Sequence, residues 1–279
     1  MFDDFASLYF HRIKDDSYIK CFENNEANPN TKKAEITANT PNWQIILKFP
    51  NLEELILDHP TREQVEAVIH LPKLKRLHII KVQLKNIEFL KELRELEELK
   101  MVYISGFSDL SPIENLSKLK SLYIQNFRRI SDFSSISSLK SLKYLSINGT
   151  FDWKQAIKNF DFLGSLENLE YFSVWLINCK DKFPLFRSDL KLKKLKNVML
   201  SRNEFSLEDY VFWETYFPNV KGTKVELAKK LDSSDNLYFL GKGDGYVNAN
   251  NKNSEEKINA YKKRYEKIKS ELNQKISDV

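Results

Sequence analysis

Cysteine, glycine and histidine are scarce in this 279-residue sequence, which contains two, seven and four of them respectively. Cys21 and Cys179 lie far apart, so they suggest neither a disulfide framework nor a metal site, and a reducing cytoplasm is the expected location. The histidines never cluster with cysteine or with one another at metal-ligand spacing. We therefore expect no bound metal at His11, His59, His70 or His78.

Sequence signals of catalysis are also missing. The one glycine-rich stretch, residues 241–245, lacks the Gly-x-x-x-x-Gly-Lys-Ser/Thr spacing that wraps a phosphate, so we interpret it as a turn between strands. No Ser, Thr or Cys occupies a recognisable nucleophile motif. The sequence therefore predicts neither a cofactor nor an enzymatic activity.

Long apolar runs are absent, because no stretch approaches the roughly 20 apolar residues of a membrane-spanning helix. The first residues, Met1-Phe2-Asp3-Asp4, are acidic where an export signal would be basic. The net charge of +5 is spread over a surface of mixed sign, without the concentrated basic stripe of a nucleic-acid binder. We expect neither membrane insertion nor a nucleic-acid partner.

One nine-residue motif recurs through the middle of the chain. It has apolar residues at positions 1, 7 and 9, Leu at position 4, and variable residues elsewhere. Eight copies occupy residues 49–57, 71–79, 93–101, 116–124, 139–147, 166–174, 192–200 and 217–225, the last one degenerate. Their fourth positions are 22 to 27 residues apart. Such spacing is typical of leucine-rich repeats and predicts a solenoid.

Each copy ends in an alternation such as Leu77-His78-Ile79, which predicts a short strand with two side chains in the core. Between strands, apolar residues fall at every third position, as at Leu84, Ile87, Leu90 and Leu93. That step favours 3₁₀ or short helical returns. Because neighbouring copies would pair their strands in parallel, we expect a curved stack with the strands on its inner side.

The 22-residue copies and their returns resemble the short leucine-rich repeats of the bacterial internalins, over about residues 49–203. The resemblance implies a horseshoe whose concave strand face binds protein partners. Most copies lack the Asn that follows the strand in that family, and only Asn203 keeps it. We expect other groups to bond the turn backbone at the equivalent positions, which hold Val82, Ile104, Phe127, Thr150 and Ile177.

The predicted fold class is thus an α/β solenoid: a leucine-rich repeat horseshoe with parallel concave strands, 3₁₀ or short-helix convex returns and two caps. The predicted divisions are an N-terminal cap (residues 1–48), the repeats (49–226) and a C-terminal cap (227–279). Strands are expected at residues 7–13 and 33–37, with a short helix at 207–217. A helix beginning near Asn253 carries one apolar stripe, formed by Ile258, Tyr261, Tyr265, Ile268 and Leu272.

The outward side chains of the predicted strands are the candidate functional residues. They are largely charged in the N-terminal copies and include Tyr, Trp and Met in the C-terminal ones. Tyr, Trp and Arg are the usual anchors of protein interfaces, each worth ~2 kcal/mol or more when well packed. The predicted partner-binding residues are Arg76, His78, Lys100, Tyr103, Tyr123, Tyr144, Tyr171, Trp175 and Met199.

These observations favour a non-enzymatic protein-interaction module, for example a bacterial immunity or adaptor protein. For the tyrosines, the alternative is that they only pack along one another across the parallel strands. The alternative function is a binder of nucleic acid or an anionic surface through basic residues of the terminal helix, namely Lys262, Lys263, Arg264, Lys267 and Lys269. An enzyme with a site in one of the caps has no motif in its favour.

Overall fold

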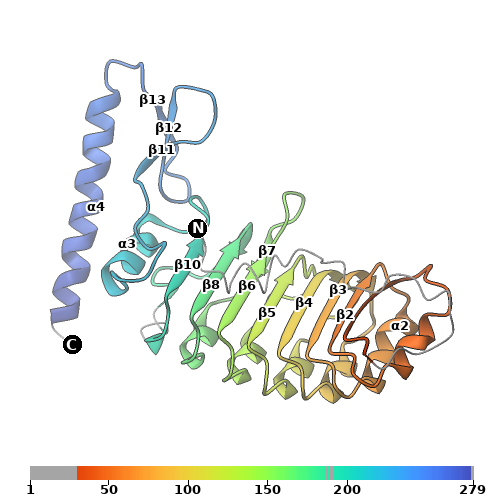
Figure 1. Ribbon diagram of the computed structural model, residues 1–279. Coiled ribbons are helices and arrows are strands. Elements are labelled where there is room, and N and C mark those ends of the chain that lie inside the picture. The colour runs from red at the N-terminus through yellow and green to blue at the C-terminus, as the bar shows by residue number, and fades with distance from the viewer. Residues whose placement is uncertain (1–29, 187, 189–190, 278–279) are drawn as a thin grey trace.

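The computed structural model describes residues 30–186, 188 and 191–277. Its main feature is one eight-stranded sheet in which all neighbouring strands are parallel (Figure 1). The strands, in spatial order, are β1 (Lys33–Thr37), β2 (Glu54–Asp58), β3 (Arg76–Gln83), β4 (Glu98–Ser105), β5 (Ser121–Gln125), β6 (Tyr144–Asn148), β8 (Tyr171–Trp175) and β10 (Asn197–Leu200).

The alternation along each strand places two apolar side chains in a continuous core. Leu77 and Ile79 of β3 are both fully buried. The sheet register sets Leu77 beside Leu99, Leu99 beside Leu122, and Leu122 beside Leu145. The predicted ladder of parallel strands is therefore confirmed.

The named return segments are 3₁₀ turns and one short α-helix, as the three-residue step predicted. Leu90, Leu93 and Leu96 donate their N–H groups to the carbonyl oxygens of Ile87, Leu90 and Leu93, at 3.1, 3.1 and 3.0 Å. The returns are η1 (Trp43–Lys48), α2 (Arg62–Glu66), η2 (Ala67–His70), η3 (Glu88–Glu92), η4 (Ser111–Asn115), η5 (Ser134–Ser138) and η6 (Asp161–Ser165). They form the second layer of the stack, opposite the strands (Figure 1).

Strand β1 joins this sheet although it lies within residues 1–48, the predicted N-terminal cap. The other expected cap strand, residues 7–13, lies outside the described residues, as do His11 and Cys21. At the opposite end, the degenerate copy at residues 217–225 contributes one isolated bridge, between Asn197 and Lys221, and no named strand. The regular sheet therefore ends at β10.

Polar side chains from a later copy bond the turns that lack the usual Asn. The buried Gln155 accepts from the N–H of Phe127 at 2.8 Å and donates to the carbonyl oxygens of Phe127 and Ile130 at 3.1 and 2.8 Å. Gln64 likewise donates to the carbonyl oxygen of Thr37 at 2.8 Å. The expectation that turn groups find other partners is met at Phe127, one of the five positions for which it was made.

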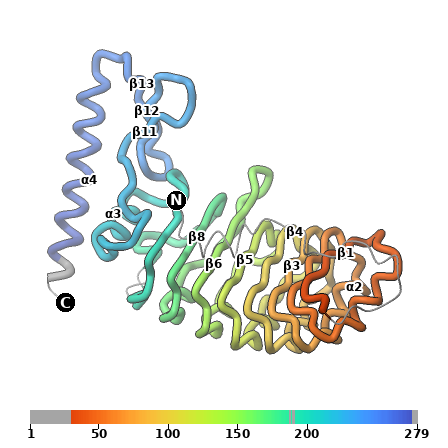
Figure 2. The backbone as a smooth tube through the Cα atoms, in the orientation of Figure 1, coloured from red at the N-terminus to blue at the C-terminus, as the bar shows by residue number. Residues whose placement is uncertain are grey.

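The C-terminal end of the core is closed by α3 (Leu207–Tyr216), whose Trp213 is fully buried. Beyond it lie a small antiparallel sheet of β11 (Ala228–Lys230), β12 (Asn236–Phe239) and β13 (Tyr246–Asn248), and the long α4 (Ser254–Ser277). Figure 2 shows α4 running alongside α3 and this sheet.

The apolar stripe of α4 packs on its own chain. The ring of Tyr261 stacks on Phe239, with centroids 4.4 Å apart, and Lys269 of α4 pairs with Glu214 of α3 at 2.7 Å. A short strand pair, β7 (Gln155–Ile157) with β9 (Ile177–Cys179), lies beside the main sheet. No helix among the described residues is long and apolar enough to cross a membrane.

We predict that Gln155→Leu destabilises the chain by about 3 kcal/mol, because it leaves the buried N–H of Phe127 and two carbonyl oxygens without their partner. Urea unfolding measures the loss, and amide exchange at Phe127 should accelerate. Gln83→Leu is the matched control, because Gln83 is exposed, and it should change stability by less than about 0.5 kcal/mol. Equal effects of the two substitutions would contradict this role of Gln155.

Candidate protein-binding face

The outward side chains form rows that cross the sheet, because the parallel register stacks equivalent positions of successive copies. The first row is Glu54, Arg76, Glu98, Ser121, Tyr144, Tyr171 and Asn197. The second is Ile56, His78, Lys100, Tyr123, Ser146, Ser173 and Met199. The third is Asp58, Ile80, Val102, Gln125, Asn148 and Trp175.

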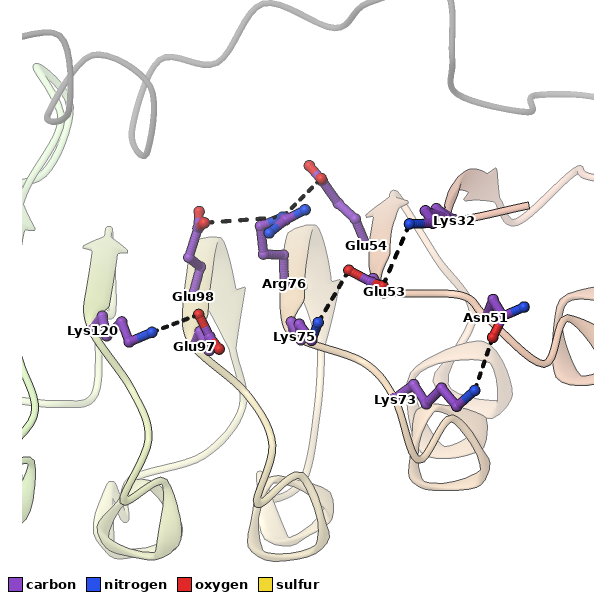
Figure 3. Close-up of polar contacts among 10 residues, drawn as sticks. All are labelled: Lys32, Asn51, Glu53, Glu54, Lys73, Lys75, Arg76, Glu97, Glu98 and Lys120. Carbon is purple, nitrogen blue, oxygen red and sulfur yellow. Dashed lines mark hydrogen bonds and ion pairs between the residues drawn. The ribbon is translucent and has the colours of Figure 1, made fainter. Parts of the chain in front are cut away.

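The N-terminal part of the first row is an ion-pair cluster. The Nε of Arg76 lies 2.9 Å from an oxygen of Glu54, which is fully buried, and 4.0 Å from one of Glu98 (Figure 3). Burial lowers the pKa of Arg76, but the hydrogen bond and charge of Glu54 outweigh it, so the pKa is raised overall. Arg76 is thus a fixed cation in the sheet surface.

A second set of ion pairs follows the points where the chain enters the strands. Glu53 pairs with Lys75 at 3.3 Å, and Lys120 pairs with Glu97 at 2.9 Å (Figure 3). Farther along, Glu170 lies 2.6 Å from Lys196, and this pairing lowers the pKa of Glu170. Exposed pairs contribute at most about 1 kcal/mol each. They link residues of neighbouring copies and so favour the observed register.

The C-terminal half of the face is aromatic, as the sequence indicated. Tyr144 and Tyr171 form a cluster separate from the core, with Tyr123 packed against it. Only 7% of Tyr144 and 6% of Tyr171 is exposed. The Nζ of Lys100 lies 5.1 Å from the ring centroid of Tyr123, and burial lowers the pKa of this lysine. The tyrosines therefore pack along one another in the structure, the arrangement named as the alternative to binding.

The other predicted residues lie around this cluster. Tyr103, Trp175 and Met199 are exposed, whereas His78 is half-buried in the second row. Tyr103 occupies a left-handed backbone conformation with φ 56°, as does Lys81, with the same φ, in the preceding copy. Such a φ is rare for a bulky residue, so its recurrence marks a turn set by the repeat.

Sequence reasoning missed two exposed aromatic residues, Phe151 and Trp153, in the turn between β6 and β7. The signal that could have found them is the 27-residue spacing between Leu142 and Leu169, which is longer than the preceding spacings. Extra residues in one repeat form a loop outside the regular stack. Aromatic residues in such a loop have no core position to fill.

The backbone just beyond Trp175 is bonded by Glu204, whose Oε1 accepts from the N–H of Ile177 at 3.1 Å. Burial raises the pKa of this carboxyl, although the Ile177 N–H and nearby lysines act in the opposite direction. Among the residues that the structure describes, no group of three or more His, Cys, Asp or Glu side chains could hold a metal ion.

The comparisons with known proteins give solved structures only, since no protein-family model and no curated protein matches the sequence. Internalin C2 of Listeria monocytogenes is 25% identical, covering 51% of this chain and 68% of its own, with a TM-score of 0.38. Internalin F of the same organism is 18% identical over 67% of this chain, with a TM-score of 0.40. A leucine-rich repeat protein of Leptospira interrogans is 21% identical over 65% of this chain, with a TM-score of 0.46.

The aligned parts span 64% of the internalin F chain and 47% of the Leptospira chain. The fold class therefore follows from this chain itself, from its repeat spacing, its parallel ladder and its 3₁₀ returns. The chain is a leucine-rich repeat solenoid.

We predict that Glu204→Gln keeps the hydrogen bond to Ile177 and is at least as stable as the wild type at pH 7. The folded-state pKa of Glu204 lies above its ordinary value of 4.5. The cost of a buried charge is therefore absent below about pH 4.5 and grows as the pH rises through the folded pKa. Urea unfolding at several pH values measures this. The free energy of unfolding of the variant, relative to that of the wild type, should increase from acid to neutral pH. The opposite trend would show a carboxylate stabilised by its surroundings.

Proposed function

We propose that this chain is a non-enzymatic protein-interaction module that binds a protein partner on its concave strand face. The contact residues would be those of the three rows, with Arg76, His78, Lys100 and Tyr123 in the middle and Trp175 and Met199 toward the edges. Tyr103, which follows the third-row residue of β4, would add to them. Tyr144 and Tyr171 would support this surface from within their cluster. A cytoplasmic bacterial immunity protein or adaptor would use such a face.

The observation that carries the proposal is the division of one sheet surface into a charged part and a part that carries Tyr, Trp and Met among small polar residues. Arg76 is held by two carboxylates, and Lys100 by the Tyr123 ring, so both cations are positioned before a partner arrives. Interfaces gain affinity when their groups are ordered in advance, because less conformational entropy is lost on binding. Exposed Tyr, Trp and Met at the edges supply apolar contact area.

The structure gives less support to nucleic-acid binding through α4. Arg264 pairs with Asp244 at 2.8 Å and with Glu208 at 3.3 Å, and Lys269 pairs with Glu214 at 2.7 Å. Cations that are already paired with carboxylates release fewer counterions from a phosphate backbone. Arg264 and Lys269 therefore stabilise the packing of α4, whereas Lys262, Lys263 and Lys267 are exposed.

We predict that a photo-crosslinking amino acid at Met199 or Tyr103 captures the same cellular protein, whereas one at Glu114 does not. Met199 and Tyr103 flank the strand face, and the exposed Glu114 lies in η4, on the return side of the stack. Crosslinked bands identified by mass spectrometry give the readout. A second variant, Lys100→Glu with Met199→Ala, should abolish capture from Tyr103 while its circular-dichroism spectrum stays that of the folded chain. Capture from Glu114 alone would contradict the proposal.

A further inference from the structure

The turn between β6 and β7 is held by several backbone hydrogen bonds. Trp153 and Thr150 exchange backbone hydrogen bonds at 2.7 and 3.1 Å, and Gly149 donates to the carbonyl oxygen of Trp175 at 2.8 Å. A Cβ at Gly149 would lie only 2.0 Å from the carbonyl oxygen of Leu176, so no other residue fits there without a backbone shift. The turn is thus bonded within itself and to the end of β8.

This turn and the end of β8 carry exposed aromatic side chains. Phe151 is 86% exposed, Trp153 is 41% exposed and Trp175 is 39% exposed. Phe151 and Trp175 meet edge to face, with centroids 5.4 Å apart, and the Cζ of Arg128 lies 5.5 Å from the centroid of the Trp153 ring. We call Arg128, Phe151, Trp153 and Trp175 the rim cluster. An exposed aromatic surface loses the free energy that burial would provide. Contiguous exposed apolar patches are therefore often interaction sites.

The charges of the rim cluster favour an acidic group as its ligand. No ion pair within the described part of the chain involves Arg128, and contact with an aromatic face leaves the N–H groups of a guanidinium able to donate to a carboxylate. Lys154, which follows Trp153 in sequence, is exposed as well. A carboxylate approaching Trp153 would therefore meet a positioned cation.

We propose that the rim cluster docks a segment of the protein partner that carries a carboxylate beside a large apolar side chain. The apolar side chain packs against Phe151 and Trp175, and the carboxylate binds Arg128. This rests on the proposed function, since Trp175 ends the third row and the Nε2 of Gln125 in that row donates to the carbonyl oxygen of Gly149 at 3.3 Å. The partner would extend from the strand face onto the rim.

Two other classes of ligand fit the cluster less well. Asp152 is exposed between the two aromatic residues of the turn, so its carboxylate would be costly to place in lipid hydrocarbon. Strands of nucleic acid stack successive bases on separate ring faces. Here Phe151 contacts Trp175 edge to face, so the two rings form one continuous apolar surface and not two separate stacking faces.

The test is selection of phage-displayed random linear peptides on the full chain, with depletion on the Phe151→Ala, Trp175→Ala double variant. The enriched peptides should carry Asp or Glu next to Leu, Ile, Phe or Trp. In fluorescence anisotropy with one such peptide, Phe151→Ala and Trp175→Ala should each weaken binding about thirtyfold, as expected of hot-spot residues. Arg128→Ala should weaken it about tenfold, and Arg128→Glu should weaken it further.

Matched controls keep the test specific. Arg129→Ala removes a neighbouring arginine, and Tyr246→Ala removes another exposed aromatic ring, which is 59% exposed; neither should alter peptide affinity. The high exposure of Phe151 predicts an unchanged melting temperature for Phe151→Ala. Peptides without acidic residues, or affinity that survives Phe151→Ala, would overturn the proposal. So would binding to phosphatidylglycerol vesicles or oligothymidine that is lost in Phe151→Ala.

The experiments distinguish failure of the rim-cluster proposal from failure of the proposed strand-face function. Crosslinking from Met199 without rim-dependent peptide binding removes only the rim proposal. Rim-dependent peptide binding together with crosslinking from Glu114 alone removes the strand face as the main contact.

Discussion

Every part of this molecule depends on the fact that no single repeat can bury its own apolar side chains. Leu99 and Leu122 are almost completely buried because the register places each of them between equivalents in the neighbouring copies. Stability is therefore a sum over neighbours rather than a property of one unit. The same register that buries the core stacks the outward residues into rows, so the candidate binding face follows from the core packing.

The ends of the strands show how the chain satisfies its backbone without the usual Asn. Gln64, Gln155 and Glu204 each reach back across 27 or 28 residues to a turn in an earlier copy. Buried polar side chains with several backbone partners are costly to replace, because each lost bond leaves an unsatisfied group. These three residues therefore join neighbouring repeats through hydrogen bonds, in addition to the apolar contacts of the core.

The repeats could be predicted from sequence because a fixed spacing of Leu and a three-residue step of apolar residues each permit one local geometry. The outward positions followed from the same alternation. Two things could not be derived in this way. The packing of Tyr144 against Tyr171 depends on ring orientations across strands, which no one-dimensional pattern encodes. The placement of Phe151 and Trp153 depends on a turn in the longest copy, whose shape is set by hydrogen bonds to Leu176 and Trp175.

The side chains that reach back from one copy to an earlier one also limit how the array can change its length over generations. Deleting the stretch that carries Gln155 would leave the turn at Phe127 without its side-chain hydrogen bonds. The turn after β3 is bonded differently, since Leu84 donates there to the backbone oxygen of Ser105 and the exposed Arg62 of the preceding copy donates to the carbonyl oxygen of Gln83. Unequal recombination should therefore add or remove units more readily near β3 than near the buried Gln155.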